Sequence, residues 1–380
     1  MVLDKTSIDN HPFEGGGNYR IFYHESDPLI ELVNIIWRFL SVAVDEPVSS
    51  LLIHNSQSKD ANLFTPTVER VAQNNLCSES KITLSTSGTT GKPKIIEKSI
   101  AEAFEKKQPG KADEIWLLTF APFRWAGLSV MVHVLKSNCH LVVPNSLSPE
   151  DLLKAALEQK VSHISLTPSY FRKLQLSLGN DKLGLLMLKQ VTFGGEVASQ
   201  SVLDNAKGIW PEARISHVYA STEFGDICSV SDGYVGIPKL KFSSKRFEFS
   251  EDGELFIDEK PTGDYWEDRN GRYHFLGRRE EIINVGGLKV SPIEVESVAI
   301  GLNGVVQARA YPIKSPILGE VVGLEYEGSV SELELKNFLR SKLPKIAWPV
   351  TVKQVEHIRI TAAGKIDRIA DKQGELDNGI

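Results

Sequence analysis

Residues 84–96, LSTSGTTGKPKII, combine glycine, hydroxyl and lysine side chains in one short stretch. Gly88 and Gly91 permit positive φ and close backbone approach, the hydroxyls add hydrogen-bond donors, and Lys92 and Lys94 supply positive charge. This combination suits a polyphosphate. An ordinary solvated turn has a similar composition, so the stretch by itself leaves both interpretations open.

The stretch is not a Walker A loop. That motif needs a glycine, four further residues and then Gly-Lys-Ser/Thr at the start of a helix. Here only two residues separate the glycines, and Pro93 stands where the hydroxyl should be. The flanking residues 81–84 and 95–96 are short and mostly β-branched or apolar, so we predict that the loop joins two strands.

Residues 193–199, FGGEVAS, follow a predicted strand. Gly194 and Gly195 would let a flat base approach the backbone closely. A plain turn from a strand to a helix is the alternative interpretation.

Residues 217–225, HVYASTEFG, place Tyr219, Thr222 and Glu223 just after another predicted strand. Ligands of open α/β sheets bind at such positions. A carboxylate there can hold Mg²⁺ that is bound to phosphates and to water. Alternatively, Glu223 lies in the first turn of a capped helix.

Two stretches in the last third of the chain carry charged residues next to glycines. In residues 261–296 we predict Asp264 in a turn and Arg278 after a strand, where they suit ribose hydroxyls and phosphate. In TAAGKIDR, residues 361–368, Lys365 follows a glycine and can reach into a cleft as a point charge. Solvated surface side chains are the alternative for each of them.

Composition narrows the classes of protein. The chain has 380 residues, 41% of them hydrophobic, which predicts a folded protein of two domains. The net charge of −6 and the absence of a long basic run argue against nucleic acid as a partner. Three widely spaced cysteines without a CxxC pair argue against a disulfide framework and a zinc site, and they fit a reducing cytoplasm.

The most apolar long window, residues 116–135, contains Pro122, Arg124 and Gly127. A buried strand, turn and helix is therefore expected there rather than a membrane span. The N-terminal residues have no apolar core of the signal-peptide kind.

Strand-like and helical segments alternate through the middle of the chain, which predicts an α/β fold with a largely parallel sheet. The predicted strands are 115–120, 140–143, 163–166, 188–193 and 215–218, and the predicted helices are 128–135, about 149–159 with Ser148 as N-cap, and one that starts at Pro168.

After residue 230 the pattern changes to short strands, 253–257 and 272–276, with Asn270-Gly271 as a hairpin turn, which predicts a small β-rich subdomain. From residue 293 the order helix, strand, strand, helix, strand predicts a compact α+β unit that ends near residue 369.

The joint order of the motifs TSGTTGKPK, GGE, YASTE, TGD, GRREEIINVGGLKVSPIEVE and GKIDR, over roughly residues 80–370, resembles the adenylate-forming superfamily. That superfamily contains acyl-CoA synthetases, luciferases and nonribosomal peptide adenylation domains. The resemblance implies a large AMP-binding domain, residues 1–279, with an abbreviated first subdomain. It also implies a small mobile α+β domain, residues 280–380.

The implied reaction is ATP-dependent activation of a carboxylic acid to acyl-AMP with release of pyrophosphate, followed by thioester formation with CoA. ATP and Mg²⁺ are the implied cofactors. Two alternatives remain. One is a stand-alone adenylating enzyme that loads the phosphopantetheine of a holo-carrier protein. The other is a catalytically silent, nucleotide-binding relative.

The resemblance also assigns roles to residues. Glu223 would hold Mg²⁺ with Thr222 near the α-phosphate, Asp264 would accept the ribose hydroxyls beside Arg278, and Lys365 would be the catalytic lysine. The remaining nucleotide-binding residues would be Thr86, Ser87, Gly88, Thr89, Thr90, Gly91, Lys92, Lys94, Gly194, Gly195, Glu196, Tyr219, Ala220 and Ser221.

For the second step, Glu280 matches the family's hinge. Rotation about it would withdraw Lys365 and bring Gly286 and Gly287 to the site, where they leave space for a pantetheine arm.

PFRWAGLS, residues 122–129, resembles the family's acyl-pocket motif, and the implied pocket residues are Arg124, Trp125, Gly127 and Val218. Arg124 stands about where a histidine is common. It is either a salt-bridged structural residue or a partner for an anionic or hydroxyl group of the substrate. Short bacterial members include o-succinylbenzoate-CoA ligases. Their substrate is an aromatic dicarboxylate, which would offer Arg124 an anionic group to bind. Because the segment before residue 84 is short, part of the wall that the family's first subdomain usually forms would be missing. The neighbouring subunit of a homodimer would cover that gap.

Overall fold

The computed structural model describes residues 2–3, 18–23, 36, 50–55, 68–71, 81–86, 94–99, 109–122, 124–358 and 366. The described chain forms two compact units, the first reaching Tyr234 and the second starting at Val235. The domain boundary expected between residues 279 and 280 falls inside the second unit and stays a prediction.

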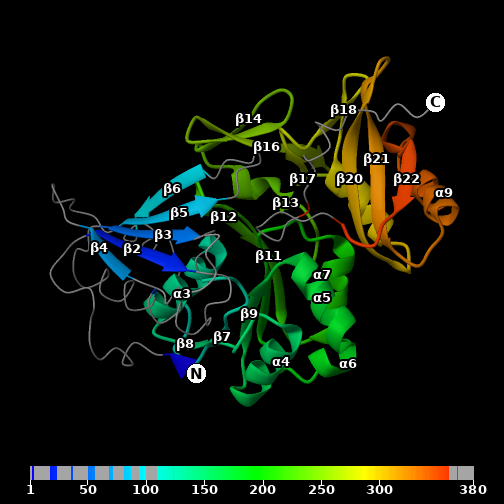
Figure 1. Ribbon diagram of the computed structural model, residues 1–380. Coiled ribbons are helices and arrows are strands. Elements are labelled where there is room, and N and C mark those ends of the chain that lie inside the picture. The colour runs from blue at the N-terminus through cyan, green and yellow to red at the C-terminus, as the bar shows by residue number, and fades with distance from the viewer. Residues whose placement is uncertain are drawn as a thin grey trace. The chain divides into compact units, whose positions relative to one another are not determined.

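A sheet of seven strands forms the centre of the first unit, in the order β1-β8-β7-β9-β10-β11-β12 (Figure 1). Neighbours from β8 to β11 pair in parallel, whereas β1 and β12 pair antiparallel at the two edges. This confirms the predicted α/β class. The strands are β1 (Val2–Leu3), β7 (Ile115–Leu117), β8 (His140–Val142), β9 (His163–Leu166), β10 (Gln190–Phe193), β11 (Arg214–Ser221) and β12 (Gly225–Val230).

Helices connect the parallel strands and begin at local sequence signals. Ser148 caps α4 by accepting a hydrogen bond from the Asp151 N–H at 3.2 Å, and Thr167 caps α5 through the Tyr170 N–H at 3.0 Å. In Figure 1, α4 to α7 lie together beside the sheet. The helices are α3 (Trp125–Ser137), α4 (Pro149–Glu158), α5 (Pro168–Leu178), α6 (Asn180–Leu183) and α7 (Gln200–Ile209).

The apolar window of residues 116–135 forms β7, a turn and most of α3, as expected. None of the helices within the described ranges is long and apolar enough to span a bilayer.

The first unit also holds a sheet in the order β4-β2-β3-β5-β6. Its last two strands pair antiparallel, with Thr86 opposite Lys94. The prediction that the glycine- and hydroxyl-rich loop joins two strands is thus confirmed, while residues 87–93 lie outside the described residues. The strands are β2 (Asn18–Tyr23), β3 (Ser50–Asn55), β4 (Val68–Val71), β5 (Lys81–Thr86) and β6 (Lys94–Ser99).

The second unit begins with an antiparallel sheet in the order β13-β17-β16-β15-β14, as the short-strand pattern predicted. Asn270 and Gly271 have φ of 53° and 79°, the left-handed pair that a tight hairpin turn requires. The elements are β13 (Ile237–Pro238), the 3₁₀ helix η1 (Lys239–Phe242), β14 (Phe247–Phe249), β15 (Glu254–Ile257), β16 (Lys260–Arg269) and β17 (Arg272–Arg278).

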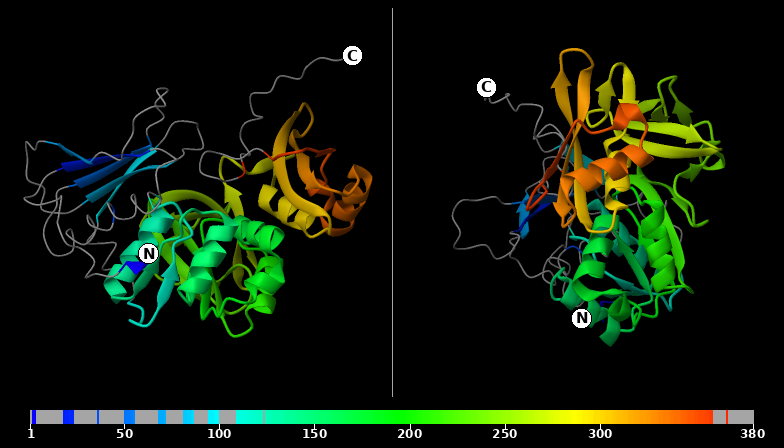
Figure 2. Two further views of the ribbon diagram at one scale, coloured as in Figure 1. Left: turned by 60° about the horizontal axis from the view of Figure 1, so that its bottom comes forward. Right: turned by 90° about the vertical axis from the view of Figure 1, so that its right-hand side faces the viewer.

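The rest of the second unit is the predicted α+β arrangement. Its sheet has the order β19-β18-β21-β20, with β22 paired to β21, and Figure 2 shows the long β20–β21 hairpin beside the helices. Leu324, Leu335 and Leu339 are fully buried between helices and sheet. The elements are β18 (Ile283–Val285), β19 (Leu288–Val290), α8 (Pro292–Ile300), β20 (Val305–Ser315), β21 (Gly319–Gly328), α9 (Glu332–Lys342), the 3₁₀ helix η2 (Lys345–Ala347) and β22 (Thr351–Gln354).

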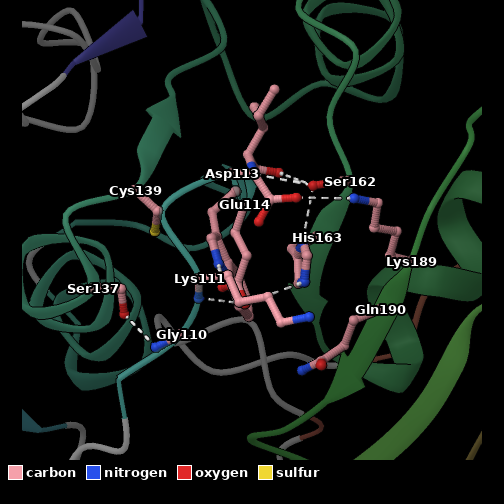
Figure 3. A network of polar contacts seen from close by, with 12 residues as sticks. Gly110, Lys111, Asp113, Glu114, Ser137, Cys139, Ser162, His163, Lys189 and Gln190 are labelled. Atoms are coloured by element: carbon pink, nitrogen blue, oxygen red, sulfur yellow. Dashed lines mark hydrogen bonds and ion pairs between the residues drawn. The ribbon is translucent and has the colours of Figure 1, made fainter.

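A polar cluster lies where β7 and β9 begin, at the amino ends of the parallel strands (Figure 3). Glu114 accepts a hydrogen bond from Trp116 Nε1 at 2.9 Å, and its carboxylate lies 3.4 Å from His133 Nε2 and 3.8 Å from His163 Nε2. Ser162 Oγ lies 2.8 Å from His163 Nδ1. Burial lowers the pKa of His163 below 6.5, although the Glu114 carboxylate opposes this shift.

We expect His163→Asn to weaken the pH dependence of the free energy of unfolding in the pH window that opens as the pH falls through the ordinary histidine pKa of 6.5. In this window the unfolded chain binds more protons than the folded one, so wild-type stability falls as the pH falls. Urea unfolding of both proteins from acid to neutral pH measures the two slopes. Some slope remains in the variant because burial also lowers the pKa of His274. Equal slopes would contradict the assignment.

Candidate active site

Parallel pairing brings segments that are distant in sequence together at the carboxyl ends of the strands of the central sheet. Phe193, the last residue of β10, pairs with Leu166 at the end of β9 and with His217 in β11. The segments that follow β9 and β10 therefore leave the sheet at the same side, level with Val218 of β11. This is the side at which open α/β sheets bind ligands.

The glycine segment after β10 leaves space beside its backbone. A Cβ at Gly194 would meet no atom within 4 Å, and Gly195 has φ of 79°, a conformation that favours glycine. These features fit the close approach of a flat base. The segment also connects β10 to α7, so the alternative of a strand-to-helix turn describes its backbone as well.

Glu196 has a structural partner. Its Oε2 accepts a hydrogen bond from the Ser169 N–H at 3.0 Å, so the carboxylate contacts the first turn of α5. The start of this helix was not predicted as part of the site. Thr167 lies there too, with its Cγ2 3.5 Å from the position that a Cβ on Gly195 would take. The Thr-Pro pair directly after a strand was the available signal.

The segment after His217 differs from the prediction in one respect. β11 continues to Ser221, so Tyr219 lies inside the strand rather than after it. Thr222 and Glu223 form the turn to β12, in which the Phe224 N–H donates to Ser221 Oγ at 3.0 Å. The capped-helix alternative for Glu223 is therefore wrong, because an antiparallel strand follows.

The Glu223 turn fits a magnesium ion that keeps water among its ligands. Glu223 is exposed at the turn, where its carboxylate is accessible from solvent. Within the described ranges, no three His, Cys, Asp or Glu side chains converge on a common metal position. One carboxylate with phosphate and water ligands is the usual protein contribution to a Mg²⁺–nucleotide complex.

The predicted acyl-pocket residues lie at the start of α3 and in β11. Arg124 is the N-cap residue of α3 and Trp125 is its first residue. A Cβ at Gly225, where φ is 74°, would lie 3.9 Å from Trp125 Cζ2, so the indole packs beside the turn between β11 and β12. Val218 is half-buried in β11. The structure thus brings Trp125 next to the Glu223 turn.

Asp264 lies inside β16, which corrects the prediction of a turn. Gly263 before it has φ of 74°, and this local distortion explains why TGD resembles a turn in sequence. Asp264 is 3% exposed and pairs with Arg278 across the ladder. Its Oδ1 lies 3.4 Å from Arg278 Nε. The predicted pair of a carboxylate and an arginine is therefore present within the second unit.

The predicted hinge and pantetheine residues also belong to the second unit. Glu280 lies between β17 and β18. Gly286 and Gly287, with φ of 58° and 87°, form the exposed turn between β18 and β19. Their roles stay predictions. Lys365 lies outside the described residues.

Gly127 is required by packing at the start of the acyl-pocket helix. A Cβ there would lie 2.4 Å from the carbonyl oxygen of Ala121, which is backbone and cannot easily yield. The absent side chain thus lets α3 pack closely on the turn that precedes it.

We expect Gly127→Ala to lower the free energy of unfolding by about 1–3 kcal/mol, because the added methyl group forces α3 away from that turn. Gly208→Ala is the matched control. Gly208 is also in a helix, and its Cβ would meet nothing within 4 Å, so this change should be neutral or stabilise by up to about 1 kcal/mol. Urea unfolding compares the two variants. Equal stability of both would refute the packing role of Gly127.

Comparison with known proteins agrees with the motif order. Residues 41–243 match the family model described as AMP-binding enzyme. A 2-succinylbenzoate–CoA ligase of Lactococcus lactis subsp. lactis (strain IL1403) is 23% identical over 318 residues, which cover 76% of this chain and 69% of that protein. A 3,4-dihydroxybenzoate–(aryl-carrier protein) ligase of Bacillus anthracis is 35% identical over 103 residues, 27% of this chain and 25% of that protein.

Among solved structures, the o-succinylbenzoate CoA synthetase (MenE) from Bacillus subtilis in complex with its acyl-adenylate intermediate has a similar fold. The TM-score is 0.62 at 19% sequence identity, over 90% of this chain and 81% of that chain. Since the family model matches more than half of the residues, the chain belongs to the AMP-binding enzyme family and has the fold of the adenylate-forming superfamily.

Proposed function

We propose that this protein activates a carboxylic acid with ATP, forms acyl-AMP with release of pyrophosphate, and transfers the acyl group to CoA. One observation carries the proposal. In a chain of this family, the open glycine segment at Gly194 and the exposed Glu223 emerge at the same edge of a parallel sheet. Open space for a base and an accessible carboxylate for Mg²⁺ are what a nucleotide needs at such an edge.

The chemistry that ATP supplies is an electrophilic α-phosphorus with pyrophosphate as leaving group, and Mg²⁺ neutralises phosphate charge. Of this chain's residues, Tyr219 and the Gly194 segment would contact the adenine. Asp264 would accept the ribose hydroxyls with Arg278 beside it. These assignments rest on the resemblance together with the positions described above.

The attacking carboxylate and the α-phosphate are both negative, so the reaction needs positive charge at that point. Lys365 would provide it, while Lys92 and Lys94 would bind the β- and γ-phosphates. Fixed charges that stabilise a transition state commonly contribute a hundredfold or more to the rate.

We expect Lys365→Ala to lower carboxylate-dependent exchange of labelled pyrophosphate into ATP by about a hundredfold or more, because the attacking carboxylate loses its stabilising charge. Circular dichroism and urea unfolding should show an unchanged fold. Lys353→Ala, which removes an exposed lysine of β22, serves as the control and should retain wild-type exchange. Normal exchange by the Lys365 variant would overturn the assignment. Absence of exchange by the wild type with every acid of a broad panel would favour the catalytically silent alternative.

For the second step we propose that Glu280 is the hinge and that the turn at Gly286 and Gly287 lines the path of the pantetheine arm. The support is that both glycines are exposed and in the left-handed region, and that a Cβ at Gly287 would meet no atom within 4 Å.

A carrier protein is the second candidate acceptor. It is favoured by the similarity of 103 residues to a protein named as an aryl-carrier-protein ligase. Competition between free CoA and a phosphopantetheinylated carrier protein for the preformed acyl-AMP separates the two acceptors.

Arg124 offers a hypothesis about the acid. It occupies the N-cap position of the helix that begins with Trp125, which packs beside the Glu223 turn, and there an anionic or hydroxyl group of the substrate would meet a guanidinium.

If Arg124 binds such a group, we expect Arg124→Leu to lower kcat/KM for an aromatic dicarboxylate by roughly tenfold or more relative to the matching monocarboxylate, as for other hydrogen bonds to charged groups. Arg124→Lys should retain part of the preference because it keeps the charge. Steady-state kinetics with both acids measures the ratio. An unchanged ratio in the leucine variant would assign Arg124 a structural role.

A further inference from the structure

Glu254 is a buried acid in the small β-rich subdomain. It begins β15 and is only 4% exposed. A buried carboxylate is costly unless its oxygens are paired. Both are: Oε1 accepts a hydrogen bond from the Gly263 N–H at 3.1 Å, and Oε2 forms an ion pair with Arg279 Nη2.

The Gly263 residue that Glu254 holds directly precedes Asp264. Its N–H is bound by Glu254, and its carbonyl oxygen accepts a hydrogen bond from the Arg279 N–H at 2.7 Å. Gly263 is thus held on both sides in its left-handed conformation, with φ of 74°. This fixes the backbone direction from which the Asp264 side chain departs.

A second chain of hydrogen bonds fixes Thr262, the residue before Gly263. The Asp264 N–H donates to Thr262 Oγ1 at 3.1 Å, and the Thr262 hydroxyl donates to the Leu255 carbonyl oxygen at 2.7 Å. Leu255 follows Glu254 in β15. The strand that carries Glu254 therefore holds residues 262–264 at two points.

Arg279 extends the same network toward the proposed hinge. It lies between Arg278, which pairs with Asp264, and Glu280. The Arg278 carbonyl oxygen accepts hydrogen bonds from the N–H groups of Glu281 and Ile282 at 2.9 and 3.0 Å, so the chain turns directly after Arg279. One carboxylate thus contacts both the Asp264 segment and the residue before Glu280.

We propose that Glu254 is a positioning residue for the nucleotide: it orients Asp264 toward the ribose and links that orientation to Arg279, next to the hinge. This inference rests on the proposed function, in which Asp264 binds the ribose. A residue that merely stabilised the sheet would change folding stability without acting through Asp264.

The test is a double-mutant cycle on ATP binding, measured by isothermal titration calorimetry with the full chain. Glu254→Gln keeps an acceptor for the Gly263 N–H but loses the charge that pairs with Arg279. We expect it to weaken ATP binding about tenfold in the wild-type background, as for a lost charged hydrogen bond. In the Asp264→Asn background it should weaken binding less than about twofold, because residues of one network are not additive.

Asp258→Asn is the matched control. It breaks an exposed ion pair of the same subdomain, Arg246 Nη2 to Asp258 Oδ2 at 2.9 Å, and should leave ATP affinity unchanged. Urea unfolding of each variant confirms that the chain is folded at the titration temperature. Should Glu254→Gln prove unfolded, Arg279→Met provides the same cycle by removing the cation of the pair.

The outcomes separate the two levels of the proposal. Equal losses from Glu254→Gln in both backgrounds would overturn the positioning role and leave the proposed function intact. If wild type binds ATP no better than Asp264→Asn, the ribose assignment within the proposed function fails instead.

Discussion

The candidate site depends on the parallel pairing of β9, β10 and β11. The buried side chains Ile164, Val191 and Ile215 lie at paired positions across these strands. Because side chains alternate between the two faces of a sheet, a slip of one residue would turn these apolar side chains to the wrong face. Hydrophobic burial thus fixes the register, and the register places Gly194 level with Val218 of β11. The packing of apolar side chains within the strands thus determines which residues lie at the candidate site.

The amino and carboxyl ends of the parallel strands differ in the surroundings of their polar groups. At the amino ends, Glu114 and His163 interact with each other and with Trp116, His133 and Ser162. At the carboxyl ends, Gly194 and Glu223 leave open space and an accessible carboxylate. The difference lies in exposure, because Glu223 is exposed to solvent whereas His163 is only 7% exposed. This contrast favours the carboxyl ends of the strands as the functional side, because a ligand can reach them.

Features that depend on local physics were predictable from sequence. The cap at Ser148, the helix start at Pro168, the turn at Asn270-Gly271 and the alternation of strands and helices all follow from nearby residues. Asp264 was wrongly predicted to lie in a turn, because a glycine with positive φ inside a strand has the same sequence pattern as a turn. The contacts of Glu196 with α5 and of Glu254 with Arg279 join residues 25 or more positions apart. Such pairs depend on the tertiary fold, and a single sequence gives no signal for them.

Two buried acids in one small subdomain impose a further constraint. Asp264 and Glu254 are 3% and 4% exposed, and each is paired with one of two consecutive arginines, Arg278 and Arg279. Taking these acids out of water is unfavourable, and replacing such pairs by apolar residues is often neutral or stabilising. Stability alone therefore gives little reason for this arrangement. Orientation gives a better one, since neighbouring arginines that each hold a different acid fix the end of β17 against β15 and β16 at the residues from which a ribose would be bound.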